Sequence, residues 1–476
     1  MDALLGGDPD SGVAVTGVSL SSSRVLPGDL YAALPGARAH GADHAREALT
    51  AGAVAVLTDE AGAARIPAGV PVLVVAEPRR ALGPVSAAVY AVASGTLAMI
   101  AVTGTQGKTT TTRLAEGALQ ASGTRAAVIG TVGTRMDGAE IRTSLTTPEA
   151  PDLHALFAMM REQGVQACAM EVSSHALVMG RVDGVVFDVA VFTNLGRDHL
   201  DFHRDVEEYF AVKASLFTPE RARLALVNID DEHGRRLVDL AGVPVRTFSA
   251  AGGAADWRAV DVELSADGSR FTVVGPGGLR VPAGVPLPGD FNVANALAAV
   301  AACAEAGFDP ARIAAGIATG GGVPGRLERV DLGEDFTVVV DYAHKPDAVE
   351  ATLQTLRPLT EGRLIVVLGA GGDRDPGKRP LMGEIAARLA DVLVITDDNP
   401  RTEDPATIRQ ALLSGAQGPA EVLEEGDRRA AIRLALARAQ TGDIVVVAGK
   451  GHETGQEVHG VVHPFDDRVV VREELR

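Results

Sequence analysis

The strongest chemical signal in the sequence is a glycine-rich segment, residues 104–110, which reads Gly-Thr-Gln-Gly-Lys-Thr-Thr and lies between an apolar run and a helical pattern. Glycines let backbone N–H groups wrap around phosphate oxygens, and the N-terminus of the following helix adds partial positive charge. Lys108 would reach the outer phosphates and Thr109 would ligate Mg²⁺. Alone, Gly-Lys-Thr often only caps a helix, but its position between strand and helix favours nucleotide binding. The predicted nucleotide contacts are Gly104, Thr105, Gln106, Gly107, Lys108, Thr109 and Thr110.

Three further clusters of polar residues follow predicted strands, at the positions where open α/β sheets bind their ligands. Carboxylate oxygens suit Mg²⁺, so Glu171 is the expected partner of Thr109 on the ion. His199 is less expected, because imidazole is an uncommon Mg²⁺ ligand and a hydrogen bond to a ligand is the alternative. Lys213 follows Glu-Glu-Tyr in a helical pattern, and these residues alone would make it a surface lysine.

Three loop-like segments in the last third of the chain carry side chains suited to a zwitterion. They are residues 373–379, 398–401 and 449–453. A guanidinium can bind both oxygens of a free carboxylate, which favours Arg374 and Arg401, whereas Glu453 would accept a hydrogen bond from an amine. Residues 398–401, Asp-Asn-Pro-Arg, could alone be a simple turn. Together the three loops carry side chains of both signs.

The elements that must position these residues follow from hydrophobic periodicity. Apolar strand-like runs alternate with helical patterns, which predicts an α/β fold with mainly parallel sheets and helices on both faces. The expected strands are residues 97–102, 126–129, 167–172, 185–192, 224–228, 337–340, 364–368, 392–396 and 444–448. Residues 244–288 show short alternating runs, which predict antiparallel strands appended to the middle domain. A Gly- and Pro-rich segment, residues 319–325, is the expected linker.

Length and composition bound the class of protein. With 476 residues, 46% of them apolar and 22% charged, the chain fits two or three folded domains. Cys168 and Cys303 lie in Ala-rich apolar stretches, so we expect buried thiols and no disulfide framework. The net charge of −18 argues against nucleic-acid and anionic-membrane partners. The uncharged stretch 82–102 contains Pro and Gly and is better explained by a helix followed by a strand than by a membrane span.

The N-terminal residues lack the basic start and apolar core of a signal peptide, so we expect a cytoplasmic protein, and we expect it to be a monomer. Arginine greatly outnumbers lysine among the 44 basic residues. The few lysines are therefore candidates for sites that need a compact ammonium or a reactive amine, with chance as the alternative. They are Lys108, Lys213, Lys345, Lys378 and Lys450.

The phosphate loop is shorter than the general Walker pattern, and in this form it resembles that of the Mur ligase and folylpolyglutamate synthetase superfamily, where Asn is more usual than Gln106. The resemblance covers nearly the whole chain and implies an ATP-dependent amide-bond ligase. A carboxylate would attack ATP to give an acyl phosphate, and an amine would then displace phosphate. It also implies three domains: residues 1–97 for the nucleotide-linked substrate, a central P-loop domain over 98–323, and a Rossmann-like amino-acid-binding domain over 324–476.

Several site residues are implied only by this resemblance. Mur ligases use a histidine in the Asn-Leu-x-x-Asp-His setting of His199 to help hold a second magnesium, and they carry a carbamylated lysine (N6-carboxylysine) at the position of Lys213. A carbamate is an anion with oxygen ligands, whereas an ammonium would repel the cation. Further ATP contacts are implied at Asn292 and Asn295 for the adenine, Arg326 for the phosphates and Asp341 for the ribose.

The resemblance also implies the residues that contact the two substrates joined by the ligase. The Asp398-Asn399-Pro400-Arg401 loop resembles that of the diaminopimelate-adding members, and lysine-adding members lack this arginine. The implied diaminopimelate contacts are Arg374, Asp398, Asn399, Pro400, Arg401, Gly449 and Glu453. The implied contacts to a UDP-N-acetylmuramoyl dipeptide of peptidoglycan assembly are Ser21, Ser23, Thr146, Thr147, Ser173, Met179 and Arg181. Some relatives have Gln at the place of Met179.

Two alternatives stay open at this point. The first is another ligase of the superfamily, such as a folylpolyglutamate synthetase or a lysine-adding Mur ligase, which would use the same ATP chemistry on a different acceptor. The second is a nucleotide sensor that kept the phosphate loop without catalysis. Residues 398–401 argue against the first, and the joint presence of Glu171, His199 and Lys213 argues against the second.

Overall fold

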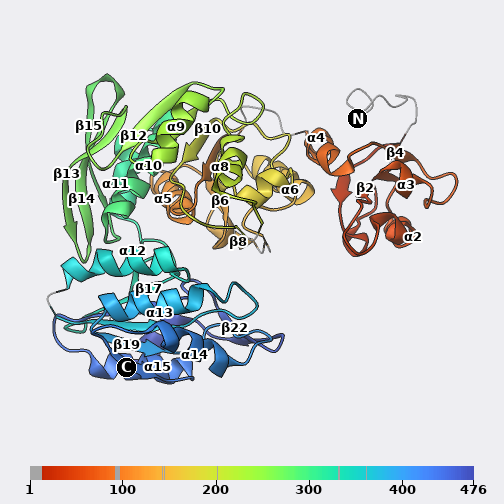
Figure 1. The fold of residues 1–476 in the computed structure, drawn as a ribbon. Helices are drawn as coiled ribbons and strands as arrows, with labels where there is room; N and C mark the ends of the chain where they lie inside the picture. Colours follow the sequence, from red (N-terminus) through yellow and green to blue (C-terminus); the bar gives the residue numbers. More distant parts are fainter. Residues whose placement is uncertain are drawn as a thin grey trace. The chain divides into compact units, whose positions relative to one another are not determined.

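The computed structural model describes residues 13–91, 97–141, 143, 145–200, 202–330, 333–360 and 362–475 (Figure 1). The chain divides into two compact units, each built from several segments. The first comprises residues 1–260, 273–281 and 295–316, and the second comprises residues 261–272, 282–294 and 317–476. Strands and helices alternate along most of the chain, so the predicted α/β class with mainly parallel sheets is confirmed.

The N-terminal part of the first unit is a small four-stranded parallel sheet. Its strands pair in the order β1 (Gly17–Ser19), β2 (Asp29–Ala32), β3 (Ala55–Thr58) and β4 (Val72–Val74). The main helices beside it are α2 (Ala45–Ala51), α3 (Glu60–Ala63) and α4 (Pro78–Tyr90). Alternate residues of β2 and β3 enter two small apolar clusters, so both faces of this sheet are covered.

The second sheet has 11 strands in the order β15-β14-β13-β12-β11-β10-β5-β9-β6-β7-β8. Its centre is parallel and runs through β10 (Val189–Phe192), β5 (Ala98–Thr103), β9 (Ala167–Glu171) and β6 (Ala126–Gly130). These strands are fully buried apart from the first residue of β5, as expected when helices cover both faces. The carboxyl ends of the four strands therefore share one edge, and the chain that follows each strand lies beside the others there.

The remaining elements of this sheet and its helices complete the fold. The strands are β7 (Gly133–Met136), β8 (Ala139–Ile141), β11 (Ala225–Asn228), β12 (Val245–Ser249), β13 (Trp257–Ser265), β14 (Gly268–Gly275) and β15 (Leu279–Val285). The helices are α5 (Lys108–Ala121), α6 (Ala150–Glu162), α7 (Ser174–Val178), α8 (Val206–Ala214), α9 (Glu232–Leu240), α10 (Asp290–Glu305) and α11 (Pro310–Ala318). Of the helices in the described part of the chain, none has the length and apolar character that a bilayer span requires.

The prediction for residues 244–288 is wrong at its start. β12 pairs in parallel with β11, and β13 pairs in parallel with β12 through Phe248 and Trp257. The strands β12–β15 continue the large sheet, and the antiparallel prediction fails for β12 and for the start of β13. For β12 the reason is the helix α9 between β11 and β12, because a strand that returns after a helical crossover pairs in parallel.

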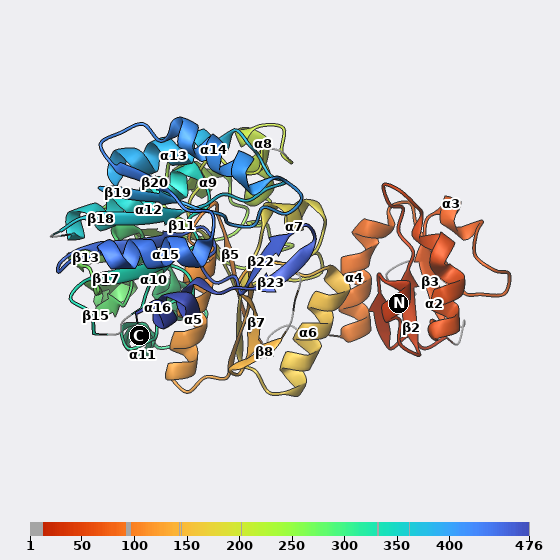
Figure 2. The same cartoon turned by 90° about the horizontal axis from the view of Figure 1, so that it is seen from below.

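The third sheet belongs to the second unit and has the order β16-β17-β21-β18-β19-β20. Its strands are β16 (Glu328–Arg329), β17 (Thr337–Asp341), β18 (Leu364–Leu368), β19 (Val392–Ile395), β20 (Glu421–Glu424) and β21 (Ile444–Ala448). All pairs are parallel except that of β16 with β17. A hairpin that the sequence analysis did not predict, β22 (Gly455–Val458) with β23 (Val461–Pro464), follows β21 (Figure 2).

Helices cover both faces of this third sheet. On one face lie α12 (Pro346–Leu356), α13 (Lys378–Leu389) and α14 (Pro405–Gly415), and on the other lie α15 (Arg428–Arg438) and α16 (Asp467–Glu474). Alternate residues of each strand enter the two cores, with Val366 in one and Val367 in the other. The loops after β18, β19 and β21 consequently meet at one end of this sheet.

Candidate active site

The phosphate loop leaves the central strand β5, and its two glycines adopt conformations that other residues would strain. Gly104 has φ +146°, and a Cβ there would lie 1.9 Å from Thr193 Oγ1. Gly107 has φ +84°, and a Cβ there would lie 2.3 Å from Asn295 Oδ1. Side chains at either position would push the loop away from its neighbours. The tight path brings the N-terminus of α5 to the edge where the strands end.

The chain after β10 holds the loop in place. Thr193 Oγ1 donates to the carbonyl of Gln106 at 2.7 Å, and the Gln106 backbone N–H donates to Asn194 Oδ1 at 2.9 Å. These bonds use only the backbone of residue 106. The Gln side chain at this position is thus compatible with the loop geometry.

Two lysines converge on one atom of the loop. Lys108 Nζ lies 2.9 Å and Lys213 Nζ lies 2.8 Å from the carbonyl oxygen of Gly104. Lys213 is only 1% exposed, so the surface position that its sequence neighbours alone would indicate does not occur. Lys213 projects from α8. The N-cap residue of this helix is Asp205, whose side chain accepts a hydrogen bond from the backbone N–H of Glu208.

Tyr209 links three predicted site residues, although the sequence analysis gave it no role. Its hydroxyl lies 3.2 Å from Thr105 Oγ1, its ring centroid lies 4.6 Å from Lys213 Nζ, and the His199 ring packs edge-on at 6.0 Å. Burial raises the pKa of Tyr209 well above its usual range, so the phenol stays protonated and available for the bond to Thr105. Its position one turn before Lys213 on α8 is the signal that could have identified it.

Glu171 is the last residue of β9 and is 1% exposed. Both of its oxygens are fixed by Thr131, which follows β6: the backbone N–H donates at 2.8 Å and the hydroxyl at 3.0 Å. Thr131 is a second residue that the sequence analysis missed, and its place directly after a parallel strand was the available signal. Thr109 lies buried in the first turn of α5.

His199 lies in a group of aromatic rings. Its φ is +54°, its Nε2 lies 3.3 Å from Asp198 Oδ2, and the His175 ring packs edge-on at a centroid distance of 4.8 Å. Among the described residues, no three His, Cys, Asp or Glu side chains are grouped as metal ligands. The predicted metal ligands are Thr109, Glu171, His199 and Lys213. Two of them, Thr109 and Lys213, are not His, Cys, Asp or Glu, so the predicted set contains only two residues of those types.

The residues expected to contact the muramoyl dipeptide adjoin this edge. Thr146 Oγ1 lies 3.1 Å from Thr131 Oγ1, and Thr147 Oγ1 donates to the carbonyl of Glu171 at 2.9 Å. Ser173 caps α7, with its hydroxyl accepting from the N–H of Ala176. These contacts bring the predicted threonines and Ser173 together with Glu171.

Arg181 is fixed by an acidic residue that the sequence analysis did not single out. Arg181 Nε donates to Glu149 Oε1 at 2.9 Å, and Arg79 Nη1, from α4, donates to Glu149 Oε2 at 3.1 Å. Glu149 is the N-cap residue of α6 and is bonded to both guanidiniums. Ser21 and Ser23 lie in the short helical turn between β1 and β2, with their hydroxyls 3.0 Å apart.

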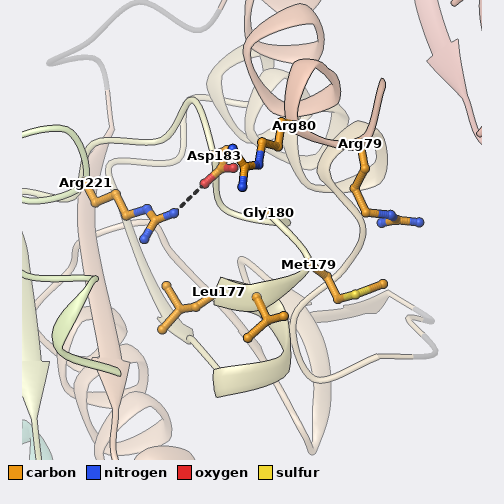
Figure 3. Close-up of a pocket in the computed structure, with 8 residues that line it drawn as sticks. Arg79, Arg80, Leu177, Met179, Gly180, Asp183 and Arg221 are labelled. Atoms are coloured by element: carbon orange, nitrogen blue, oxygen red, sulfur yellow. Dashed lines mark hydrogen bonds and ion pairs between the residues drawn. The ribbon is translucent and has the colours of Figure 1, made fainter. Parts of the chain in front are cut away.

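Met179 lines a cavity of about 330 Å³ between α4 and the turn that follows α7 (Figure 3). Arg79, Arg80 and Arg221 contribute three guanidiniums to its wall, and Arg221 donates to Asp183 at 2.9 Å. Arg79 and Arg80 are also paired, with Glu149 and Glu77, so the cavity combines ion-paired guanidiniums with an apolar part that includes Leu177. A thioether at position 179 offers no strong hydrogen bond to a ligand there.

The remaining expected ATP contacts lie in two places. Asn292 and Asn295 are on α10; Asn292 Nδ2 donates to the carbonyl of Pro288 at 2.8 Å, and Asn295 adjoins Gly107 of the phosphate loop. In the second unit, the Arg326 guanidinium stacks over the Tyr342 ring at 4.7 Å. Asp341 accepts from the N–H groups of Leu327 and Ala343.

Two of the three predicted amino-acid-binding loops are joined directly. A Cβ on Gly449 would lie 2.4 Å from Asp398 Oδ2, and Asn399 Nδ2 donates to Glu453 Oε2 at 2.7 Å. Arg401 Nη1 donates to the carbonyl of Gly372 at 2.6 Å, which ties in the loop after β18. The structure thus brings Asp398, Asn399, Arg401, Gly449 and Glu453 together. Arg374, by contrast, lies in the exposed part of the loop after β18.

Comparison with known proteins identifies the family. Three family models match successive parts of the chain: Mur ligase family, catalytic domain (residues 14–90), Mur ligase middle domain (residues 102–303) and Mur ligase, glutamate ligase domain (residues 325–451). The chain is 57% identical to the UDP-N-acetylmuramoyl-L-alanyl-D-glutamate--2,6-diaminopimelate ligase of Streptomyces avermitilis, over 98% of this chain and 94% of that protein. The protein of the same name from Corynebacterium glutamicum is 50% identical over 97% of this chain and 92% of its own length.

Solved structures agree. A structure of a UDP-N-acetylmuramoyl-L-alanyl-D-glutamate--2,6-diaminopimelate ligase superimposes with a TM-score of 0.73 and 36% identity, covering 100% of this chain and 98% of that one. The MurF ligase of Thermotoga maritima in complex with ADP shares the fold, with a TM-score of 0.64 at 19% identity and 98% coverage of both chains. Because family models cover most of the chain and relatives match it nearly end to end, this chain belongs to the Mur ligase family.

Proposed function

We propose that this chain is the ATP-dependent ligase that adds 2,6-diaminopimelate to the D-glutamate of UDP-N-acetylmuramoyl-L-alanyl-D-glutamate during assembly of the peptidoglycan precursor. The full-length relatives carry the name of this activity. The observation that carries the amino-acid assignment is the joining of Arg401 and Glu453 through one loop cluster, because a distal carboxylate needs a guanidinium and a distal amine needs a carboxylate. The products are ADP, phosphate and the new amide.

The first step brings two anions together, since the D-glutamate carboxylate attacks the γ-phosphate of ATP to give an acyl phosphate. Residues 104–110 cradle the phosphates, and Lys108 neutralises charge on the transferring group. Thr109 and Glu171 fit one Mg²⁺, because Thr131 holds both oxygens of the Glu171 carboxylate in a fixed orientation. Bound Mg²⁺ supplies positive charge that offsets the repulsion between the two reactants.

A carbamate on Lys213 resolves an electrostatic conflict in the phosphate loop. Because Lys108 Nζ and Lys213 Nζ both lie within 2.9 Å of the Gly104 oxygen, the two nitrogens are less than about 6 Å apart. Two ammonium groups at that distance in a buried site repel each other. Carbamylation turns Lys213 into an anion, which with His199 fits a second Mg²⁺.

The acceptors bind through the remaining residues. Ser21 and Ser23 contact the uridine, and Thr146, Thr147, Ser173, Met179 and Arg181 contact the muramoyl dipeptide. Asn292, Asn295, Arg326 and Asp341 complete the ATP site. Arg374, Asp398, Asn399, Pro400, Arg401, Gly449 and Glu453 bind diaminopimelate. We further propose a cytoplasmic monomer, because ATP and UDP-linked precursors are cytoplasmic substrates and one chain supplies every residue of the proposed site.

The test is phosphate release with ATP, Mg²⁺ and the UDP-muramoyl dipeptide, offering diaminopimelate, lysine or glutamate in turn. We expect turnover only with diaminopimelate. Turnover with glutamate in its place would indicate a folylpolyglutamate synthetase-like activity, and turnover with lysine a lysine-adding ligase. No phosphate release with any complete mixture would support a nucleotide sensor.

A further inference from the structure

Lys450, which follows β21, is a buried cation to which the proposed reaction gives no role. Its side chain has an exposed fraction of 0%. Its Nζ lies 3.2 Å from Asn399 Oδ1, 3.1 Å from Glu453 Oε2 and 2.6 Å from the carbonyl oxygen of Gly455. A lysine ammonium has three N–H donors, and these three acceptors use all of them. Lys450 therefore cannot bind a substrate without giving up a contact inside the protein.

The three acceptors come from three different segments. Asn399 belongs to the loop after β19, Glu453 to the turn after β21, and Gly455 to the first position of β22. Asn399 Nδ2 also donates to Glu453 Oε2 at 2.7 Å, so Lys450, Asn399 and Glu453 form a closed triangle in which each side chain contacts the other two. The ammonium is the point where the two loops and the hairpin β22–β23 are joined.

Lys450 also fixes the orientation of the Asn399 amide. Asn399 Oδ1 accepts from Lys450 Nζ and from the backbone N–H of Glu457, the latter at 2.9 Å. Rotation of the amide by 180° would place its NH₂ group against two donors and its oxygen against the Glu453 carboxylate. With the ammonium present, only the observed orientation is satisfied.

The consequence falls on Glu453. Both of its bonds from within the triangle go to Oε2, and within the part of the chain that the structure describes no hydrogen bond reaches Oε1. The side chain is 31% exposed, and Oε2 is the oxygen that the triangle holds. A carboxylate fixed by one oxygen presents the other in a defined direction.

We propose that Lys450 is a positioning residue for amino-acid specificity, which acts through Asn399 and Glu453 to aim Glu453 Oε1 at the distal ammonium of the incoming amino acid. This inference rests on the proposed function. Its distinctive consequence concerns the distal amine alone, because Arg401 and not Glu453 serves the distal carboxylate. The informative comparison is between diaminopimelate and 2-aminopimelate, which keeps the distal carboxylate and lacks the distal amine.

The experiment measures kcat/KM for both amino acids in the wild type, Lys450→Met and Glu453→Gln. In Lys450→Met we expect KM for diaminopimelate to rise about tenfold or more, which is the loss typical of one misplaced charge-assisted hydrogen bond. KM for 2-aminopimelate and KM for ATP should change little, so the preference for diaminopimelate falls. Adding Lys450→Met to Glu453→Gln should lower that preference no further, because both changes act on one contact.

The matched control is Arg438→Met, which removes a partly exposed cation of the same domain that pairs with Glu421 at 2.9 Å. It should leave the preference unchanged. If Lys450→Met does not fold, Lys450→Gln takes its place: its neutral amide can still donate to Asn399 Oδ1, but it removes the charged partner of Glu453 Oε2, so a smaller fall in the same direction is expected. An unchanged preference in a folded Lys450 variant overturns the inference. A wild type inactive with diaminopimelate would instead overturn the proposed function.

Discussion

Lys108 and Lys213 donate hydrogen bonds to the same atom, the carbonyl oxygen of Gly104, at 2.9 Å and 2.8 Å. One lysine comes from the start of α5 and the other from α8, about a hundred residues later in the chain. Their convergence joins the phosphate loop to the proposed metal site. The proposed carbamate would place an anion, in place of a second ammonium, beside that oxygen.

Replacing Lys213 tests the carbamate. Lys213→Ala should lower acyl-phosphate formation at least about 100-fold, a loss typical of removing a group that stabilises charge in the transition state. Lys213→Arg is the matched variant, because it keeps a positive charge that cannot be carbamylated, and it should be equally impaired. Added formate or acetate should partly restore phosphate release in Lys213→Ala only. Full activity of either variant would exclude the carbamate.

Arg401→Lys tests recognition of the distal carboxylate. Lysine offers a point charge where arginine offers two parallel donors, so KM for diaminopimelate should rise about 10- to 100-fold, corresponding to about 1.5–3 kcal/mol. KM for ATP should stay unchanged. Steady-state kinetics measure both, with Arg438→Lys as the control on the same domain. An unaltered KM for diaminopimelate would contradict the assignment of Arg401.

Glu149 should matter for the nucleotide-linked substrate, because it is bonded both to Arg181 and to Arg79 on α4. Glu149→Ala frees both guanidiniums, and KM for the UDP-muramoyl dipeptide should rise about tenfold through loss of charge-assisted bonds that fix Arg181. Asp152→Ala, on the same turn of α6, is the control, since its pairing with Arg24 at 3.5 Å is largely exposed. Equal effects of the two variants would argue against a specific role for Glu149.

The lowered pKa of His344 leads us to expect that the stability of the second unit depends on pH. Burial, together with the positive charge of Lys345, lowers the pKa of His344 to about 4. Between that value and the ordinary pKa of about 6.5 the unfolded chain binds more protons than the folded one, so stability is lost as pH falls through this window. The loss should approach about 3 kcal/mol near pH 4.

Chemical denaturation at pH 7, 6 and 5 measures this dependence. His344→Gln should flatten it, because a side chain that does not titrate removes the difference in proton binding. His463→Gln, which changes an exposed histidine on β23, should leave the slope as in the wild type. The same slope in both variants would show that His344 is not the group responsible.

The phosphate loop and the α/β class could be predicted because their signals are local. The glycines before Lys108 are a signal only a few residues long, and each apolar run that indicates a strand is equally short. Pairing direction is not local, and the alternation in residues 244–288 concealed the parallel pairing of β12, which depends on the helix α9. The hairpin β22–β23 was missed because its two four-residue strands, one half-buried and one exposed, show no alternation of apolar and polar residues.

The contacts around the site that the sequence did not predict join distant segments of the chain. Thr131 holds Glu171 across 40 residues, and Lys450 reaches Asn399 across 51. Lys213 is buried because α8 packs against the phosphate loop. The pattern of apolar residues in α8 does not predict this burial. Residue types with strong chemistry, Lys450 among them, could be recognised in the sequence, whereas the contacts that orient them could not.

The most direct test of the central claim, that the D-glutamate carboxylate is phosphorylated before the amide forms, is isotope transfer. The UDP-muramoyl dipeptide is labelled with ¹⁸O in the reacting carboxyl group, and the phosphate released with ATP and diaminopimelate is analysed by mass spectrometry. The proposed mechanism predicts one ¹⁸O atom in the phosphate for each diaminopimelate added. Phosphate without label, released while the amide forms, would contradict it.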